Sequence, residues 1–425
     1  MRRPTSRAIV GLAATLSVAV VLAQDTGVFR LSRDHAAIQY STRPTRDAVV
    51  TLNERIEKGD LQLAFDAPPG GYLRSVLKAL DISPSSQTLV FSENSLQRAH
   101  ISTATPRAIY FNDTVAVSWA KGADTVEATV LDATQGVHFY AIAQKPQQNP
   151  QFVRRTDCLE CHLMPQTSGV PGLFAMSQLP LSDNKNEYAQ GWATDHRTPI
   201  EDRWGGWYVT GAQVPARHLG NVPVTHVPRS YVRSEVAPKL QTGARAFDAS
   251  AYLTPDSDVV ALLVLNHQVH MTNLLTRLGW ESRVAAHEAT RSGVTLPDVR
   301  QTARELVDYM LFVDEPPLPS AVRGSTTFAQ EFTSKGPRDS KGRSLRELDL
   351  TRRLLRYPCS YMIYTETFDA LPPAAKAFAY ERLWDVLSGN AIDRAYEGLS
   401  SADRRAIIEI LRETKSGLPA YFQTR

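Results

Sequence analysis

The sequence Cys-Leu-Glu-Cys-His at residues 158–162 brings two thiols and an imidazole together within five residues. Two cysteines at this spacing can each form a thioether with a vinyl group of one haem, and the histidine that follows can bind the iron, which is the signature of c-type attachment. The covalent bonds hold the macrocycle, so the surrounding residues are left to tune the iron. The motif therefore predicts one covalently bound haem c, with Cys158 and Cys161 as attachment sites and His162 as an axial iron ligand.

Two other interpretations of the cysteine pair are weaker. Half of a zinc ribbon needs a second cysteine pair, and the only other cysteine of the chain is Cys359. A redox dithiol is expected at the start of a helix after a strand, whereas the polar segment 152–157 precedes this motif. We expect Cys359 to be a buried free thiol, and the alternative is a reactive thiol near the haem.

The N-terminus has the layout of a secretory signal peptide. Three arginines, Arg2, Arg3 and Arg7, precede an apolar run at residues 8–23. The run is shorter than the ~20 residues that a membrane-spanning helix needs, so a retained anchor is the less favoured alternative. We expect cleavage of residues 1–23, no stable membrane span in the mature chain, and a periplasmic or secreted location. Export agrees with the motif, because c-type haem is attached outside the cytoplasm.

The residue opposite His162 on the iron would decide much of its chemistry. We expect a helix over residues 258–280, in which His267 is a polar residue within an apolar sequence and is one candidate for the distal ligand. His218, in the segment 217–221, is the other candidate. The alternatives are that each histidine is an ordinary hydrogen-bonded core residue, or that the iron is five-coordinate. The aromatic segment 203–208 could form a wall against the macrocycle or a tight turn in the core.

Composition is that of an ordinary globular protein. The 425 residues are 43% hydrophobic and 21% charged, and the net charge of +3 is too small to indicate nucleic acid as a partner. The length allows two or three domains of roughly 100–200 residues. The basic segment 335–343 could dock an acidic partner or be a solvated loop.

Hydrophobic patterning predicts an α+β fold, with an N-terminal antiparallel β region, a loop-rich c-type haem segment and a mainly α-helical C-terminal half. We expect a signal peptide at 1–23, an N-terminal α+β domain at 24–150, a haem-binding region at 151–290 and a helical region at 291–425. The expected N-terminal elements are helices at 45–58 and 72–80 and strands at 87–91, 107–111, 114–119, 125–131 and 137–143. Further helices are expected at 258–280, from 295 to the Pro316–Pro317 pair, and at 345–355, 374–387 and 402–412.

Several stretches of the mature chain resemble a family of exported bacterial single-haem proteins described as cytochrome c domain-containing and without an assigned reaction. The stretches that carry the resemblance are 86–91, 95–97, 105–113, 152–154, 169–172, 195–211, 217–221, 267–268 with Met271 and Asn273, and 357–361. The resemblance implies one haem and an exported location. It carries over roles only for Cys158, Cys161 and His162.

Three functions remain open from the sequence, and the least favoured is a structural or sensing subunit that carries haem. The first is electron transfer between the haem and a periplasmic redox partner protein, with a six-coordinate iron that ignores small ligands. The second is a haem enzyme that reduces peroxide or a small nitrogen or sulfur oxide, because a bare electron carrier needs only ~100 residues. Catalytic residues are unknown in either case.

Overall fold

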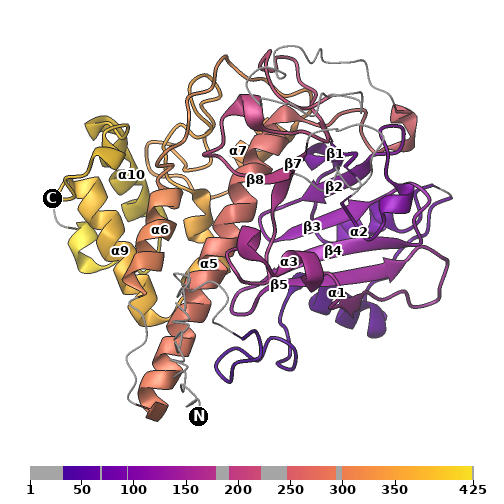
Figure 1. Ribbon diagram of the computed structural model, residues 1–425, viewed down its shortest axis with the longest axis horizontal. Helices are drawn as coiled ribbons and strands as arrows, with labels where there is room; N and C mark the ends of the chain where they lie inside the picture. Colours follow the sequence, from indigo (N-terminus) through magenta and orange to yellow (C-terminus); the bar gives the residue numbers. More distant parts are fainter. Residues whose placement is uncertain are drawn as a thin grey trace, which may run out of the picture.

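The structure is a computed structural model, and it describes residues 32–67, 69–92, 94–178, 191–221, 247–292 and 299–423. The expected signal peptide lies outside the described residues. Within these ranges the chain builds a seven-stranded sheet, in the order β6-β5-β4-β3-β2-β1-β9, and a small hairpin of β7 and β8 (Figure 1). Every pair of neighbouring strands is antiparallel.

The sheet is a meander that follows the order of the sequence up to its last strand. The strands are β1 (Thr88–Val90), β2 (Arg107–Phe111), β3 (Val115–Trp119), β4 (Thr125–Asp132), β5 (Gly136–Ala143), β6 (Val153–Arg155), β7 (Ala175–Gln178), β8 (Gly191–Thr194) and β9 (Trp207–Tyr208). Five of them confirm the expected strands within one residue at either end, and Asn112–Asp113 lies in the predicted hairpin turn. The strand β9 comes much later in the chain and pairs with β1, at Leu89↔Tyr208.

Helices α1 (Ala48–Glu57) and α2 (Leu73–Ala79) cover one face of the sheet and confirm the two predicted N-terminal helices. Asp47 caps α1, and its carboxylate accepts hydrogen bonds from the Val49 and Val50 amides. The apolar sides of both helices pack on alternate residues of the strands, including Tyr110, Val117 and Val126. This alternation is the reason that the period-two pattern was readable in the sequence.

Helix α5 (Val259–Ser292) packs against the other face of the sheet and lies between the sheet and the last two long helices of the chain (Figure 1). The predicted helix began one residue earlier and ended at Trp280, so the predicted end is wrong by twelve residues. The helix continues through Gly279 because Trp280 and Val284 beyond it are buried against Tyr40 and Leu131.

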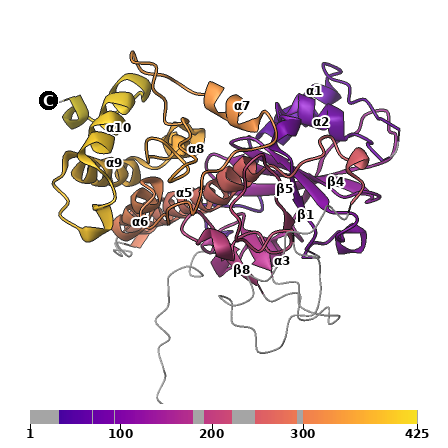
Figure 2. The same cartoon turned by 90° about the horizontal axis from the view of Figure 1, so that it is seen from above.

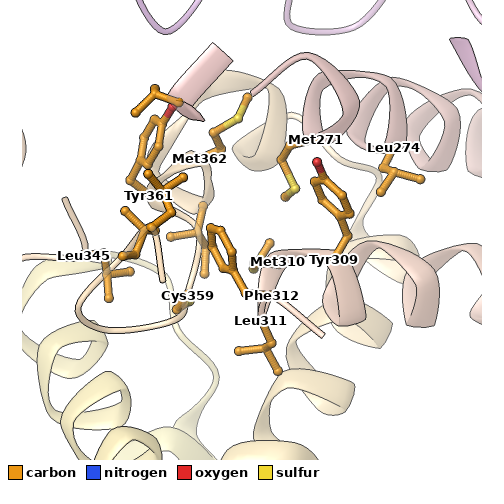
Figure 3. Packing of buried hydrophobic residues seen from close by; sticks show 14 of the residues in the cluster. Met271, Leu274, Tyr309, Met310, Leu311, Phe312, Leu345, Cys359, Tyr361 and Met362 are labelled. Atoms are coloured by element: carbon orange, nitrogen blue, oxygen red, sulfur yellow. The ribbon is translucent and has the colours of Figure 1, made fainter. Parts of the chain in front are cut away.

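The C-terminal half is helical, as expected, and its last two long helices lie on the far side of α5 from the sheet (Figure 2). Its helices are α6 (Arg300–Met310), α7 (Phe328–Ser334), α8 (Glu366–Asp369), α9 (Pro373–Ser388) and α10 (Ser401–Thr414). The helix predicted over 345–355 is wrong, because that segment folds as an irregular loop with one bridge, Leu348↔Leu355. Side chains of α5, α6 and the segment around residue 360 form the largest core, shown in part in Figure 3.

The segment 151–290, expected to bind haem, is distributed over the fold. Its first strand, β6, is one edge of the large sheet, and β9 is the other edge. In the sequence between β6 and β9 lie the four-residue helix α3 (Leu159–His162) and the β7–β8 hairpin. Among the described helices, none has an apolar stretch that would suffice to cross a bilayer.

Candidate haem-attachment site

The predicted attachment motif folds as a single helical turn directly after the edge strand β6. Cys158 precedes α3, and its carbonyl accepts the amides of Cys161 and His162. The turn is anchored by Leu159, which is buried against Phe139 and Val170. Cys161 is exposed and Cys158 is half-buried, and both are free thiols. The turn therefore presents both sulfur atoms and the following histidine without burying the cysteine pair in the core.

The imidazole of His162 is oriented by the backbone of Gly172. Its Nδ1 lies 2.9 Å from the Gly172 carbonyl oxygen, an acceptor, so Nδ1 carries the proton and donates. Iron-binding histidines commonly donate their second ring nitrogen in this way, which fixes the ring and its tautomer. No hydrogen bond to Nε2 is formed within the described part of the chain, so that atom carries a free lone pair.

Two aromatic rings pack against His162. The centroid of Phe139 lies 4.9 Å from that of the imidazole, and the centroid of Phe174 lies 5.2 Å away. Burial lowers the pKa of His162 to about 4, although the hydrogen bond to Gly172 opposes this effect. The ring is therefore neutral at neutral pH, as an iron ligand must be. The two cysteines, one exposed and one half-buried, can form thioethers with a macrocycle, and the neutral, pre-oriented imidazole can bind its iron. These residues therefore fit a covalently bound haem.

His267, the first predicted distal ligand, is fully buried and has partners on both ring nitrogens. Nδ1 lies 2.8 Å from Nδ1 of His196, and Nε2 lies 2.7 Å from Oγ of Ser360. Burial lowers the pKa of His267 to about 3, so the ring is neutral and one nitrogen carries the proton. In the part of the chain that the structure describes, no hydrogen bond or ring contact joins His267 to His162. Binding of iron by His267 would require the loss of one of these two hydrogen bonds.

His218, the second predicted distal ligand, is also buried and neutral. Its Nδ1 accepts a hydrogen bond from the Gly220 amide at 3.0 Å, so the proton of the neutral ring lies on Nε2. Nε2 is buried without a partner among the described residues, and burial lowers the pKa of the ring to about 4. A protonated Nε2 cannot bind iron, so a ligand role would require the other tautomer and the loss of the contact with Gly220.

The aromatic segment at 203–208 forms a turn in the core. Trp204 has φ 69°, and its indole N–H donates to Asn266 Oδ1 at 2.9 Å. Trp207 donates to the Met176 carbonyl at 2.7 Å, and the following Tyr208 pairs with β1. These interactions correspond to the second of the two interpretations made from the sequence.

Three of the four cations of the basic loop at 335–343 are paired within the protein, namely Arg338, Lys341 and Arg343. Arg343 contacts Asp339 and lies 2.7 Å from Glu409, and Lys341 lies 2.8 Å from the same glutamate. The loop therefore offers less free positive charge to an acidic partner than its composition suggests.

Comparison of the chain with known proteins finds no match to a family model, to a curated protein or to a solved structure. Among the described residues there is also no group of three or more histidine, cysteine or acidic side chains able to hold a metal ion. The family resemblance therefore stays an expectation, and the assignment depends on the motif and its geometry.

Sequence reasoning missed the partners of the histidines. Gly172 was recognised only as part of a shared stretch, and its hydrogen bond to His162 spans ten residues. Ser360 was assigned no role, although it holds His267 from a loop 93 residues away. The prediction for Cys359 is confirmed, because this free thiol is fully buried and lies in the largest core (Figure 3).

Proposed function

We propose that this chain is an exported c-type cytochrome that holds one haem covalently through Cys158 and Cys161, binds its iron through His162 and transfers electrons to a redox partner outside the cytoplasm. The observation that carries the proposal is the orientation of His162. Its Nδ1 is committed to Gly172, and this leaves Nε2 unprotonated beside the two thiols. The N-terminal sequence supports the exported location.

Each residue of the motif has a distinct role in the proposed site. The haem, when bound, supplies one-electron chemistry at its iron. The two thioethers would fix the macrocycle to a turn that is itself anchored by Leu159. His162 would hold the iron through Nε2, while Phe139 and Phe174 exclude water from one side of the imidazole. Exclusion of water favours the reduced state of the iron.

A haem enzyme is the second candidate, and the state of the two predicted distal ligands favours it. His267 has both ring nitrogens bonded, and His218 carries its proton on the nitrogen that would bind iron. In this arrangement neither residue has a ring nitrogen free to bind iron, and this is the observation that favours the second candidate. The substrate would then be peroxide or a small nitrogen or sulfur oxide.

The test is expression of the full chain with its own N-terminus in a bacterium that matures periplasmic c-type cytochromes. The expected result is a protein whose intact mass includes one haem that survives denaturation. Cys158→Ala and Cys161→Ala should each leave at most one thioether, and the double variant should carry no covalent haem. Cys359→Ala is the matched control, because this thiol is buried in the core, and it should retain the haem.

A folded, exported native chain without covalent haem would overturn the proposal. Addition of cyanide to the ferric holoprotein separates the two candidates. An unchanged spectrum together with reversible one-electron voltammetry supports electron transfer. A shifted spectrum together with turnover of peroxide or of a nitrogen or sulfur oxide supports the enzyme.

A further inference from the structure

Asn273 of α5 is bonded at both ends of its amide to the residue that follows Gly172. Its Oδ1 accepts a hydrogen bond from the Leu173 amide at 2.9 Å, and its Nδ2 donates to the Leu173 carbonyl at 2.6 Å. Asn273 has no exposed surface. A buried asparagine that satisfies both backbone groups of one residue fixes the orientation of the adjoining peptides.

Gly172 lies between this asparagine and the proposed iron ligand. The Gly172 amide donates to the His162 carbonyl at 3.0 Å, and the Gly172 carbonyl accepts from His162 Nδ1 at 2.9 Å. A Cβ at Gly172 would lie only 2.2 Å from Asn273 Oδ1, so the backbone and the asparagine are in direct contact. Asn273, the Leu173 backbone, Gly172 and His162 therefore form a continuous chain of hydrogen bonds and covalent links.

We propose that Asn273 is a positioning residue for the axial ligand, and that it acts by holding the Gly172 carbonyl in place to accept the proton of His162 Nδ1. The inference rests on the proposed function, because it gives α5 control over a haem ligand. The structure of the loop that carries Gly172 explains why a residue of α5 is needed to hold it. The loop 163–172 is closed on itself by Thr167, which bonds Met164 and Val170, and Asn273 ties its end to the core.

The hydrogen bond to Gly172 makes the imidazole a stronger electron donor, and a stronger donor stabilises ferric iron. Loss of the Asn273 amide should loosen the Gly172 carbonyl and weaken that bond. The ratio of ferrous to ferric protein at a fixed solution potential should then rise about tenfold, by analogy with the low end of the ~10–100-fold losses of metal affinity or activity that follow removal of a residue that orients a ligand. For a one-electron couple this is a shift of about 59 mV to more positive potential.

The experiment measures the midpoint potential of the holoprotein with Asn273→Leu and with Asn266→Leu. Asn266 is the matched control because it is also a buried asparagine of α5, seven residues earlier on the same side of the helix. Its amide bonds Trp204 and Thr194 instead of the His162 loop. Both variants lose a buried amide, so a purely structural effect would appear in both. Only Asn273→Leu should shift the potential and the iron–imidazole vibration.

Equal potentials in the two variants would overturn the role of Asn273. Asn273→Ala replaces Asn273→Leu if the larger side chain prevents folding. The native holoprotein provides an independent measurement, since hydrogen exchange of the Leu173 amide and of His162 Nδ1–H should be slow in the reduced state. Exchange of Leu173 at the rate of an exposed amide would refute the contact itself. Absence of covalent haem from the native chain would instead refute the proposed function.

Discussion

Replacement of Gly172 by alanine should destabilise the protein strongly, and the same change at Gly398 should not. At Gly172 the new Cβ would lie 2.2 Å from Asn273 Oδ1 and 2.9 Å from its Cγ, distances that side chains do not tolerate. Asn273 is buried and bonded at both ends, so it can move only by breaking its two hydrogen bonds to Leu173. Each buried group left without a partner costs about 1–3 kcal/mol, so loss of the two hydrogen bonds lowers the free energy of unfolding by about 2–6 kcal/mol.

Gly398 provides the control because an added Cβ there meets nothing within 4 Å. Alanine should leave the stability unchanged or raise it by about 0.5–1 kcal/mol, since it restricts the unfolded chain. The assay is urea unfolding at neutral pH, followed by far-ultraviolet circular dichroism on the full chain. If Gly172→Ala unfolds within about 0.5 kcal/mol of the native protein, as an ordinary surface change does, the contact between Gly172 and Asn273 is not as described.

The thiols and the buried histidines give two further predictions. In haem-free protein a thiol reagent should modify exposed Cys161 first, Cys158 more slowly and Cys359 only on unfolding. The reason is that burial raises the pKa of Cys158 to about 11 and that of Cys359 to about 12. Rapid modification of all three thiols in the folded protein would contradict this order. Burial lowers the pKa of both His138 and His267 from 6.5 to about 3, so the stability that depends on their neutral forms is complete above pH 6.5 and is lost as the pH falls toward 3. At pH 5 the free energy of unfolding in urea should be lower than above pH 6.5 by about 2 kcal/mol per such histidine. The variant His138→Gln should make the free energy of unfolding depend less steeply on pH. The same dependence in the variant and the native protein would be inconsistent with a buried neutral His138.

The strands between residues 107 and 143 were predictable because their information is local. In β3, Val115, Val117 and Trp119 are buried and the residues between them are half-buried, so the alternation is visible without knowledge of the partners. A meander also needs only short turns, and Asn112 forms one by accepting the amides of Thr114 and Val115. The strand β9 lacks such a signal, since its two residues become a strand only through pairing with distant β1.

The false helix at 345–355 shows how turn chemistry can override hydrophobic spacing. Leu345, Leu354 and Leu355 are buried, as a helix would also predict. Asp349, however, accepts the backbone amides of Thr351 and Arg352, which stabilises a turn in the middle of the segment. Leu350 adopts φ 58°, a left-handed conformation that no α-helix contains. Asp349 was therefore the residue of the sequence that indicated a turn at this point.

Local sequence information identifies only part of the candidate site, and the rest depends on residues that are distant in the sequence. Cys158, Cys161 and His162 are found from spacing alone, because the chemistry of attachment requires them to be adjacent in the sequence. The groups that orient the ligand have no such constraint. Gly172 is ten residues from His162, and Asn273 is a hundred residues from Leu173. A helix that is buried along the sheet can supply a polar side chain to any loop that reaches it, so its asparagines and histidines are ambiguous until the fold is known. His267 and Asn273 illustrate this ambiguity, since both are buried polar residues of α5, yet His267 bonds Ser360 and His196, whereas Asn273 holds the loop of the proposed iron ligand.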